Sequence, residues 1–384
     1  MKPELAFFAT TARGIEPVTA KELRALEANG VEELRGGVRF RGDMPMCYKA
    51  NLWLRTAIRV LMPIAEFTAY TPEELYAKAQ ETDWREFLTP DHTFAVDCNV
   101  RDSAITHSQY AALKLKDAIA DQFRERLGRR PSVSTQAPDV QINLHISRNV
   151  CTISLDSSGA TLHKRGYRVA QTEAPLNETL AAALVYLSGW DRCCTLVDPM
   201  CGSGTILIEA ALLAADVAPG LLRQRFGFES WPNFDEKAWR LLLDEARRRR
   251  QSCGTAAPGC ASRPKILGSD ITPEAIAAAK KNRDAAGMGE CVSFEVKDIA
   301  DLSGRPGPGV IICNPPYGER LGEVEELKPL YQVMGEVFRN RFRGWSAFVL
   351  AGNPRLARHI GLKPASRTQL FNGPIECQLL RFDL

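Results

Sequence analysis

The sequence predicts an α/β protein whose carboxyl-terminal half contains a mostly parallel sheet covered by helices on both faces. From about residue 172, apolar runs of strand length alternate with helical segments. Polar or glycine-rich motifs directly follow four of these runs, as expected where ligands bind at the carboxyl ends of parallel strands. A length of 384 residues allows two or three domains, and shifts in composition divide the chain into residues 1–65, 66–160 and 161–384.

The first unit, residues 1–65, alternates strands and helices in the manner of a small two-layer domain. We expect, in order, a strand at Leu5–Thr11, a helix at Glu16–Ala28, a strand pair around Gly36-Gly37, a helix at Met44–Leu54 and a strand at Thr56–Pro63.

The second unit, residues 66–160, opens with a helix that Thr71-Pro72-Glu73-Glu74 caps, with proline at the first helical position. A strand at Thr93–Val100 follows, and then a helix at His107–Leu127. This second helix places four apolar residues on one face, namely Ala111, Leu115, Ala118 and Ile119. Two strands about Arg148-Asn149 are expected to form a hairpin, at Val140–Ser147 and Val150–Leu155.

The third unit, residues 161–384, supplies the parallel sheet. Six candidate strands are Cys194–Val197, Ile266–Ser269, Val292–Val296, Val310–Cys313, Ser346–Leu350 and Cys377–Phe382. The long interval from Ala218 to Pro264 reads as an insertion. Its Arg247–Arg250 run is either an exposed helix end or a contact for a polyanion.

The bulk composition restricts the class of protein. Eleven scattered cysteines and five histidines show no metal-ligand spacing, which indicates a reduced, cytoplasmic protein without a structural metal. No apolar stretch suits a secretion signal or a membrane span.

The net charge of +3 is unevenly distributed. Arg101 to Ala170 contains eleven Lys or Arg residues and six Asp or Glu residues. This basic segment is either a solvated helix face or a surface for the phosphates of a nucleic acid. Its candidate contacts are Lys114, Lys116, Arg129 and Arg130.

The first motif that could bind a ligand is a glycine turn between a strand and a helix, Asp198-Pro199-Met200-Cys201-Gly202-Ser203-Gly204-Thr205. Glycines let backbone N–H groups approach a ligand closely, and a helix start favours an anion. The spacing matches neither the nucleoside-triphosphate loop nor GxGxxG. A ligand with a carboxylate and an ammonium group would suit this turn, with Asp198 facing the cation.

Two further carboxylates follow the next two strands. Asp270 is placed to accept hydrogen bonds from a ribose diol, and Asp298 from an adenine amino group. Either aspartate alone would be weak evidence because aspartate often ends a strand. Together with Asp198 and Asn314, however, they make four polar residues that end four strands.

The stretch Cys313-Asn314-Pro315-Pro316-Tyr317-Gly318-Glu319-Arg320 follows an apolar strand. A nucleobase amino group is a poor nucleophile because its lone pair is delocalised into the ring. The Asn314 side-chain oxygen and a backbone carbonyl held by the prolines can accept both of its N–H groups, and Tyr317 can stack on an extruded base. The alternative is a proline-rich turn with a buried tyrosine.

These motifs in this order resemble the amino-type S-adenosylmethionine (SAM)-dependent methyltransferases, and NPPYGER is similar to those that modify the 2-amino group of guanosine in ribosomal RNA. The segments FAVDCNVRDSAITHSQYAALKLKDAIAD and LHKRGYR resemble the THUMP-containing members of that group. The resemblance covers essentially the whole chain and is closest to enzymes acting on 23S rRNA. It implies ferredoxin-like and THUMP RNA-binding domains before a Rossmann-like domain with a mostly parallel seven-stranded sheet.

The resemblance also implies roles for individual residues. Asp198, Pro199, Gly202, Gly204, Thr205, Asp270, Asp298 and Asn314 would bind SAM, and Asn314, Pro315 and Tyr317 would act on the target base. Some relatives continue into a second methyltransferase domain, whereas this sequence ends at Leu384, so a second activity is not expected.

Several other functions are compatible with the same residues. Cys313 could be a nucleophile towards a pyrimidine, although its place in a strand favours packing. Methylation of a DNA adenine, a protein glutamine or a tRNA guanosine also fits NPPY. A non-catalytic RNA-binding or assembly factor would retain the fold, but the complete set of polar residues argues for an enzyme.

Overall fold

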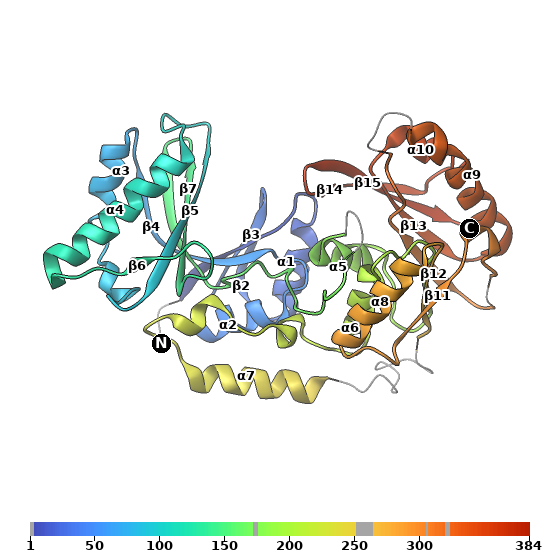
Figure 1. The fold of residues 1–384 in the computed structure, drawn as a ribbon, viewed down its shortest axis with the longest axis horizontal. Coiled ribbons are helices and arrows are strands. Elements are labelled where there is room, and N and C mark those ends of the chain that lie inside the picture. Colours follow the sequence, from blue (N-terminus) through green and yellow to red (C-terminus); the bar gives the residue numbers. More distant parts are fainter. Residues whose placement is uncertain (1–3, 172–175, 251–263, 305, 319–322) are drawn as a thin grey trace.

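A computed structural model describes residues 4–171, 176–250, 264–304, 306–318 and 323–384, whose strands form two sheets (Figure 1). The first sheet belongs to the amino-terminal half and the second to the carboxyl-terminal half. The two halves lie side by side. Helices α3 (Pro72–Ala79) and α4 (Ser108–Leu127) lie at one end of the molecule, and α9 (Glu323–Arg341) and α10 (Pro354–Arg358) lie at the other.

The amino-terminal sheet has eight strands in the order β2-β3-β1-β4-β8-β7-β5-β6. Their bounds are β1 Leu5–Thr10, β2 Asn29–Leu34, β3 Gly37–Gly42, β4 Arg59–Thr68, β5 Thr93–Arg101, β6 Ser132–Val133, β7 Val140–Ser147 and β8 Val150–Asp156. Strand β4 pairs with β1 on one side and β8 on the other. The first two predicted units therefore share one continuous sheet.

Helices α1 Glu16–Ala25, α2 Met44–Trp53, α3 Pro72–Ala79 and α4 Ser108–Leu127 complete this half, together with the short 3-10 helix η1 Trp84–Glu86. Helix α1 ends three residues before its predicted end, since Glu27 adopts a left-handed φ of 66°. The Thr71 cap is confirmed, because its side chain accepts a hydrogen bond from Glu74 N at 3.1 Å. The predicted apolar face of α4 is also confirmed, as its four residues are fully buried.

The carboxyl-terminal sheet has seven strands in the order β11-β10-β9-β12-β13-β15-β14. Their bounds are β9 Thr195–Asp198, β10 Ile266–Asp270, β11 Val292–Val296, β12 Gly309–Cys313, β13 Ser346–Ala351, β14 Ser366–Asn372 and β15 Ile375–Asp383. Neighbours from β11 to β13 run parallel, whereas β15 is antiparallel to β13 and β14. The mostly parallel sheet is confirmed, but β14 was missed because Leu370 is its only fully buried side chain.

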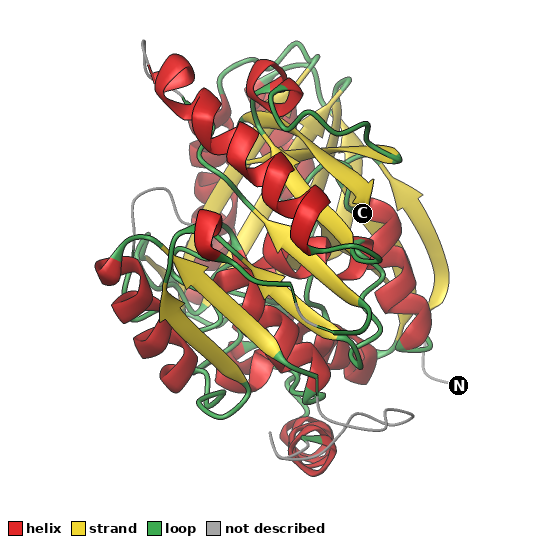
Figure 2. Cartoon of the chain, turned by 90° about the vertical axis from the view of Figure 1, so that its right-hand side faces the viewer, coloured by secondary structure: helices red, strands yellow, loops and turns green. Residues whose placement is uncertain are grey.

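Helices cover both faces of this sheet (Figure 2). They are α5 Glu178–Leu187, α6 Thr205–Ala214, α8 Pro273–Ala285, α9 Glu323–Arg341 and α10 Pro354–Arg358, with the short η4 Ile299–Asp301. Successive residues of β12 point to opposite faces of the sheet. Ile312 packs with α5, α6 and α8 on one face, and Ile311 packs with α9 on the other. This two-sided burial leaves the carboxyl ends of the strands as the open edge.

The described part of the predicted insertion packs against the amino-terminal half. It contains η2 Pro219–Leu222, η3 Gly227–Ser230 and α7 Glu236–Arg249. Tyr48 of α2 stacks on Phe228 at 4.4 Å between ring centroids, and Trp239 of α7 meets Phe228 edge-on at 5.1 Å. The Arg247–Arg250 run is an exposed helix end, in which Arg249 pairs with Asp216 and lies over the Trp53 ring. Residues 251–263 of the insertion lie outside the described residues.

Seven cysteines of the described residues are free thiols, whereas Cys193 and Cys291 are disulfide-bonded. The expectation that every thiol is reduced is therefore wrong for these two. Within the described ranges, the longest helices are too short or too polar to span a bilayer.

A candidate cofactor and nucleobase site

Four predicted polar residues meet at one edge of the carboxyl-terminal sheet. Asp198 ends β9, Asp270 ends β10, Asp298 follows β11 by two residues, and Asn314 follows β12. These four strands are neighbours and run parallel, in the order β11-β10-β9-β12. The carboxyl ends of parallel strands share one side of the sheet, so the four side chains line a common edge.

The glycine turn is held in place by the strand beside it. Gly202 N donates to Asp270 Oδ2 at 2.9 Å, and Cys201 N donates to Ser269 O at 2.9 Å. Gly204 has a φ of 82°, and a Cβ there would lie 2.8 Å from the Phe294 ring. The close contact and the left-handed backbone both require glycine at this position.

Asp198 is a buried carboxyl group with one internal hydrogen bond, which its Oδ1 accepts from Met200 N at 3.1 Å. Burial, with a smaller contribution from the nearby Asp270 carboxylate, raises the pKa of Asp198 to about 8. A cationic group placed here would reverse this effect by favouring the ionised carboxylate. The electrostatics thus suit a ligand that carries a positive charge.

Asp298 caps η4, since its Oδ1 accepts a hydrogen bond from Ala300 N at 2.8 Å. Two large apolar side chains near this residue are exposed, Ile271 by 66% and Val296 by 53%. They stand at the carboxyl ends of β10 and β11, where a planar ring would cover them. Their exposure was not predicted from the sequence, because Val296 lies in a predicted strand and Ile271 two residues after another, where an apolar side chain is usually buried.

The NPPY segment is ordered by hydrogen bonds to its backbone. Tyr331 Oη donates to Pro316 O at 3.0 Å, and Asn353 Nδ2 donates to Tyr317 O at 3.2 Å. The Tyr317 hydroxyl donates to Asn314 Oδ1, and the Tyr317 ring lies against Gly352, where a Cβ would approach it to 2.5 Å. Residues 319 and 320 of the motif lie outside the described residues.

Cys313 is fully buried in the core on the α9 side of the sheet. Burial, with a smaller contribution from Asp198, raises the pKa of its thiol well above the usual value. A nucleophilic cysteine needs an accessible thiolate, so this position supports packing rather than covalent catalysis.

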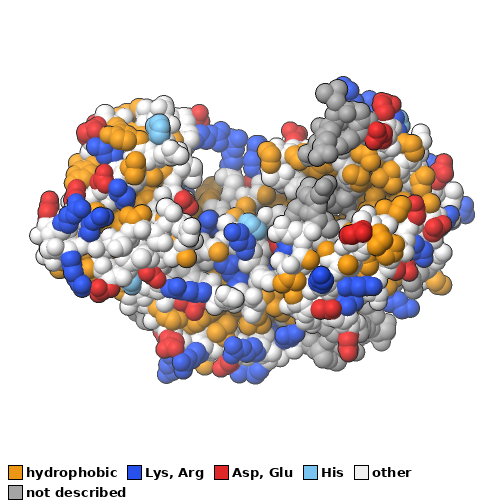
Figure 3. Space-filling view, in the orientation of Figure 1, with side chains coloured by type: hydrophobic (Ala, Val, Ile, Leu, Met, Phe, Trp, Pro, Cys, Tyr) orange, Lys and Arg blue, Asp and Glu red, His pale blue; other side chains and the backbone are white. Residues whose placement is uncertain are grey.

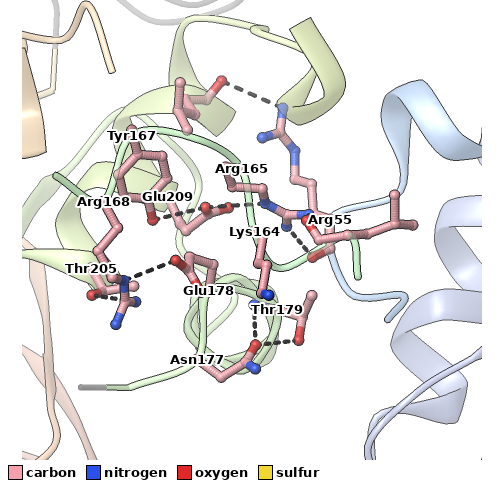
Figure 4. A network of polar contacts seen from close by, with 12 residues as sticks. Arg55, Lys164, Arg165, Tyr167, Arg168, Asn177, Glu178, Thr179, Thr205 and Glu209 are labelled. Carbon is pink, nitrogen blue, oxygen red and sulfur yellow. Dashed lines mark hydrogen bonds and ion pairs between the residues drawn. The ribbon is translucent and has the colours of Figure 1, made fainter. Parts of the chain in front are cut away.

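A buried polar network connects the two halves of the molecule behind the glycine turn (Figure 4). Arg165 is 1% exposed; it donates to Leu162 O at 2.7 Å, to Arg55 O, and to Glu209 Oε1 at 3.4 Å. Tyr167 Oη donates to the same Glu209 oxygen at 3.1 Å. Arg55 belongs to the amino-terminal half and Glu209 to α6, so the network fixes one half to the other.

The predicted nucleic-acid contacts lie far along the chain from this edge, on α4 and just after it. Lys114 pairs with Glu73 at 3.4 Å, Lys116 with Asp117 at 2.9 Å, and Arg129 with Asp91 at 3.0 Å. Arg130 is exposed. The basic surplus of this segment is thus partly balanced by carboxylates from elsewhere in the fold.

Three family models match the chain in order along its length. Residues 6–61 match the RlmL ferredoxin-like domain, residues 69–156 match the THUMP domain, and residues 165–381 match the RMKL-like methyltransferase domain.

Curated relatives cover nearly the entire chain. It is 47% identical to the ribosomal RNA large subunit methyltransferase K/L of Syntrophotalea carbinolica, over 100% of this chain and 54% of the relative. The K/L protein of Methylococcus capsulatus is 48% identical, over 98% and 51%. The chain therefore spans about half the length of these two relatives. A putative RNA methyltransferase of Synechocystis, slr0064, is 43% identical over 98% of this chain and 96% of its own.

Solved structures show the same arrangement. SMU.472, a putative methyltransferase complexed with SAH, aligns with a TM-score of 0.88 and 32% identity, over 100% of this chain and 99% of its own. A structure described as a predicted N6-adenine-specific DNA methylase from Listeria monocytogenes aligns with a TM-score of 0.87 and 33% identity, over 99% and 96%.

Proposed function

This chain belongs to the RMKL-like methyltransferase family with ferredoxin-like and THUMP domains, and from that premise we propose that it is a SAM-dependent methyltransferase acting on the 2-amino group of a guanosine in 23S rRNA. One observation carries the proposal. Asp198, Asp270, Asp298 and Asn314 line a single edge formed by four neighbouring parallel strands.

The residues of this edge fit the parts of SAM. The buried Asp198 faces the methionine ammonium, and the turn with Pro199, Gly202, Gly204 and Thr205 receives the carboxylate. Asp270 accepts from the ribose and Asp298 from the adenine amino group, with Ile271 and Val296 against the adenine ring. When bound, SAM supplies an electrophilic methyl group on sulfur.

The NPPY residues prepare the acceptor. Asn314 Oδ1 and the Pro315 carbonyl accept the two N–H groups of the guanine amino group, which draws its nitrogen toward tetrahedral geometry and frees the lone pair. The Tyr317 hydroxyl already donates to Asn314 Oδ1, which orients the amide and leaves a second lone pair for the substrate. Tyr317 is the proposed stacking partner of an extruded base; to stack, its ring must leave Gly352 and its hydroxyl must give up the hydrogen bond to Asn314, which then accepts from the base instead.

We propose three domains, a ferredoxin-like domain at 1–65, a THUMP domain at 66–160 and a methyltransferase domain at 161–384, of which the first two form the RNA-binding part. The space-filling view shows a hollow between the two ends of the molecule, with Lys and Arg side chains within it (Figure 3). Structured RNA would lie there, with Lys114, Lys116, Arg129 and Arg130 as further phosphate contacts. An rRNA substrate places the protein in the cytoplasm.

The same site also fits other amino-group acceptors. The Listeria structure is described as a DNA methylase, and an adenine amino group could occupy the NPPY site equally well. Residues 69–156 match the THUMP domain. Because we propose that this domain binds RNA, the match favours RNA over DNA as the substrate.

A methyl-transfer assay with tritiated SAM tests the proposal. We compare 23S rRNA, tRNA, duplex DNA and a release factor as acceptors. Label is expected in 23S rRNA, and after digestion it should elute with N2-methylguanosine. Label in DNA or protein alone would refute the proposed substrate, and SAM binding without any transfer would favour an RNA-binding assembly factor.

The pH dependence of Asp198 gives a separate prediction. A folded-state pKa of about 8 against an ordinary 3.8 means that the folded protein holds a proton that the unfolded chain has released. Without SAM, stability should therefore fall as pH rises from about 4 to about 8. Asp198→Asn removes this loss, so the variant should gain stability relative to wild type at pH 8 while its SAM affinity falls.

Thermal unfolding at pH 6 and pH 8, with calorimetric SAM titration, measures both effects. Asp301→Asn at an exposed position is the control and should behave as wild type. Equal pH dependence in wild type and Asp198→Asn would contradict the role of this carboxyl group.

A further inference from the structure

The segment Arg168–Ala170 contacts the start of α6, next to the glycine turn, and Asn282 of α8. Arg168 Nη2 donates to Thr205 Oγ1 at 3.3 Å, and its Nε donates to Glu178 Oε1 at 2.9 Å (Figure 4). Arg168 is thereby joined both to the first residue of α6 and to the first residue of α5. This part of the chain connects the amino-terminal half to the methyltransferase sheet, so it links the turn to the rest of the molecule.

Asn282 of α8 joins this segment to the turn. Its side-chain oxygen Oδ1 accepts hydrogen bonds from Val169 N and Ala170 N, both at 2.9 Å. Its Nδ2 donates to Ala170 O at 2.9 Å and to Ser203 O at 3.2 Å. The residue is 1% exposed. All four hydrogen-bonding positions of the amide are used, and the two N–H donors and two carbonyl acceptors allow only one orientation of it.

The turn needs support at this point. Ser203 stands between Gly202 and Gly204, whose φ values are 51° and 82°. Two left-handed glycines leave many backbone conformations open, and Ser203 is 4% exposed, so its carbonyl would lack water if Asn282 were absent. The hydrogen bond from Asn282 fixes the peptide between residues 203 and 204, whose N–H closes the turn by donating to Cys201 O at 2.8 Å.

We propose that Asn282 is a positioning residue for SAM: it holds the 203–204 peptide, and with it the shape of the glycine turn against which the cofactor binds, without touching the cofactor itself. The inference rests on the proposed function. A residue of this role acts on cofactor binding, because the turn must otherwise be ordered at the moment SAM binds. It should have little influence on RNA binding or on the methyl-transfer step.

Asn282→Asp removes the N–H donors of the side chain and keeps its oxygen acceptor. The aspartate has the same size and keeps oxygens for Val169 N and Ala170 N, but when ionised it can donate neither to Ser203 O nor to Ala170 O. We expect the KM and Kd for SAM at pH 8 to rise roughly tenfold, because the turn loses the buried hydrogen bond that holds Ser203 O. The kcat at saturating SAM and the KM for RNA should stay within about twofold of wild type.

A pH profile adds a readout that a purely structural role would not move. A protonated carboxyl group can donate to Ser203 O again, and burial among carbonyls favours that form. The ratio of variant to wild-type KM for SAM should therefore decrease as pH is lowered from 8 to 6. If Asn282→Asp does not fold, Asn282→Ser, which is too short to reach Ser203 and adds no charge, should give the same increase in KM for SAM.

Asn51→Asp is the matched control in the amino-terminal core. Asn51 is also 1% exposed; its Nδ2 donates to Cys47 O at 2.9 Å and to Ser157 Oγ at 2.8 Å. This variant should lose thermal stability as Asn282→Asp does, with an unchanged KM for SAM. The inference is overturned if both variants lose stability equally and both keep the wild-type KM for SAM. A wild-type protein that neither binds SAM nor methylates RNA would instead refute the proposed function.

Discussion

Asn314→Ala is expected to reduce methyl transfer to RNA to a trace while changing the affinity for SAM only slightly, because Asp198, Asp270 and Asp298 remain to hold the cofactor. The substitution removes the side-chain oxygen that accepts from the target amino group, and it removes the acceptor of the Tyr317 hydroxyl. Loss of one oriented group at the reacting atom commonly costs a factor of about 100 to 1,000 in kcat. Calorimetric titration with SAM and single-turnover transfer to 23S rRNA measure the two properties separately.

Cys313→Ala is the neighbouring control for this experiment. Cys313 is fully buried and packs in the core on the α9 side, so its removal should lower stability modestly and leave transfer largely intact. Complete loss of transfer in Cys313→Ala with SAM still bound would restore the thiolate mechanism. Wild-type transfer by Asn314→Ala would remove the chemical basis of the proposed function.

Arg165→Met should produce the largest loss of stability among these variants. Arg165 and Glu209 have 1% and 0% exposed side chains, and Arg165 also donates to carbonyls of residues 55 and 162. Glu209 Oε2 already lacks a partner. Methionine would leave the Glu209 carboxylate buried without a cation, and breaking a buried pair in this way costs about 3–5 kcal/mol of unfolding free energy. Urea unfolding followed by tryptophan fluorescence measures the change.

Two variants define the cause of that loss. Arg165→Met with Glu209→Gln removes the uncompensated charge and keeps an acceptor for Tyr167 Oη, so the double variant should recover at least half of the lost stability. Arg240→Met on α7 makes the same change in an exposed pair with Glu236, where an effect below about 0.5 kcal/mol is expected. If the double variant is as unstable as Arg165→Met, the buried charge is not the cause.

The position of the Arg165 network gives it a role beyond stability. It joins the Arg55 carbonyl of the amino-terminal half to Glu209, one turn after Thr205 in α6. The aromatic contacts of the insertion join the same halves at a second place, through Tyr48 and Phe228. Two separate connections of this kind hold the proposed RNA-binding half at a fixed distance from the methyl-transfer edge.

Much of the fold and site could be predicted because the relevant signals are local. Alternating apolar residues identified most strands, and proline, glycine and capping residues marked where helices begin and turns occur. Arg148 and Asn149, for example, adopt the left-handed φ values of 52° and 64° that their hairpin requires. Asp198, Asp270, Asp298 and Asn314 could be grouped from their places in the sequence, because parallel strands always bring their carboxyl ends to one edge.

The sequence alone therefore determined the parallel sheet, the order of its motifs and the residues at its open edge. Only the tertiary structure decided which distant groups meet: β4 joining two units in one sheet, α7 packing on α2, Glu73 and Asp91 balancing basic residues, and Asn282 holding the turn. The physical reason is the distance along the chain over which each kind of interaction acts. Helix and strand patterns arise between residues a few positions apart, whereas the partner of a buried arginine or asparagine is set by the packing of the whole chain.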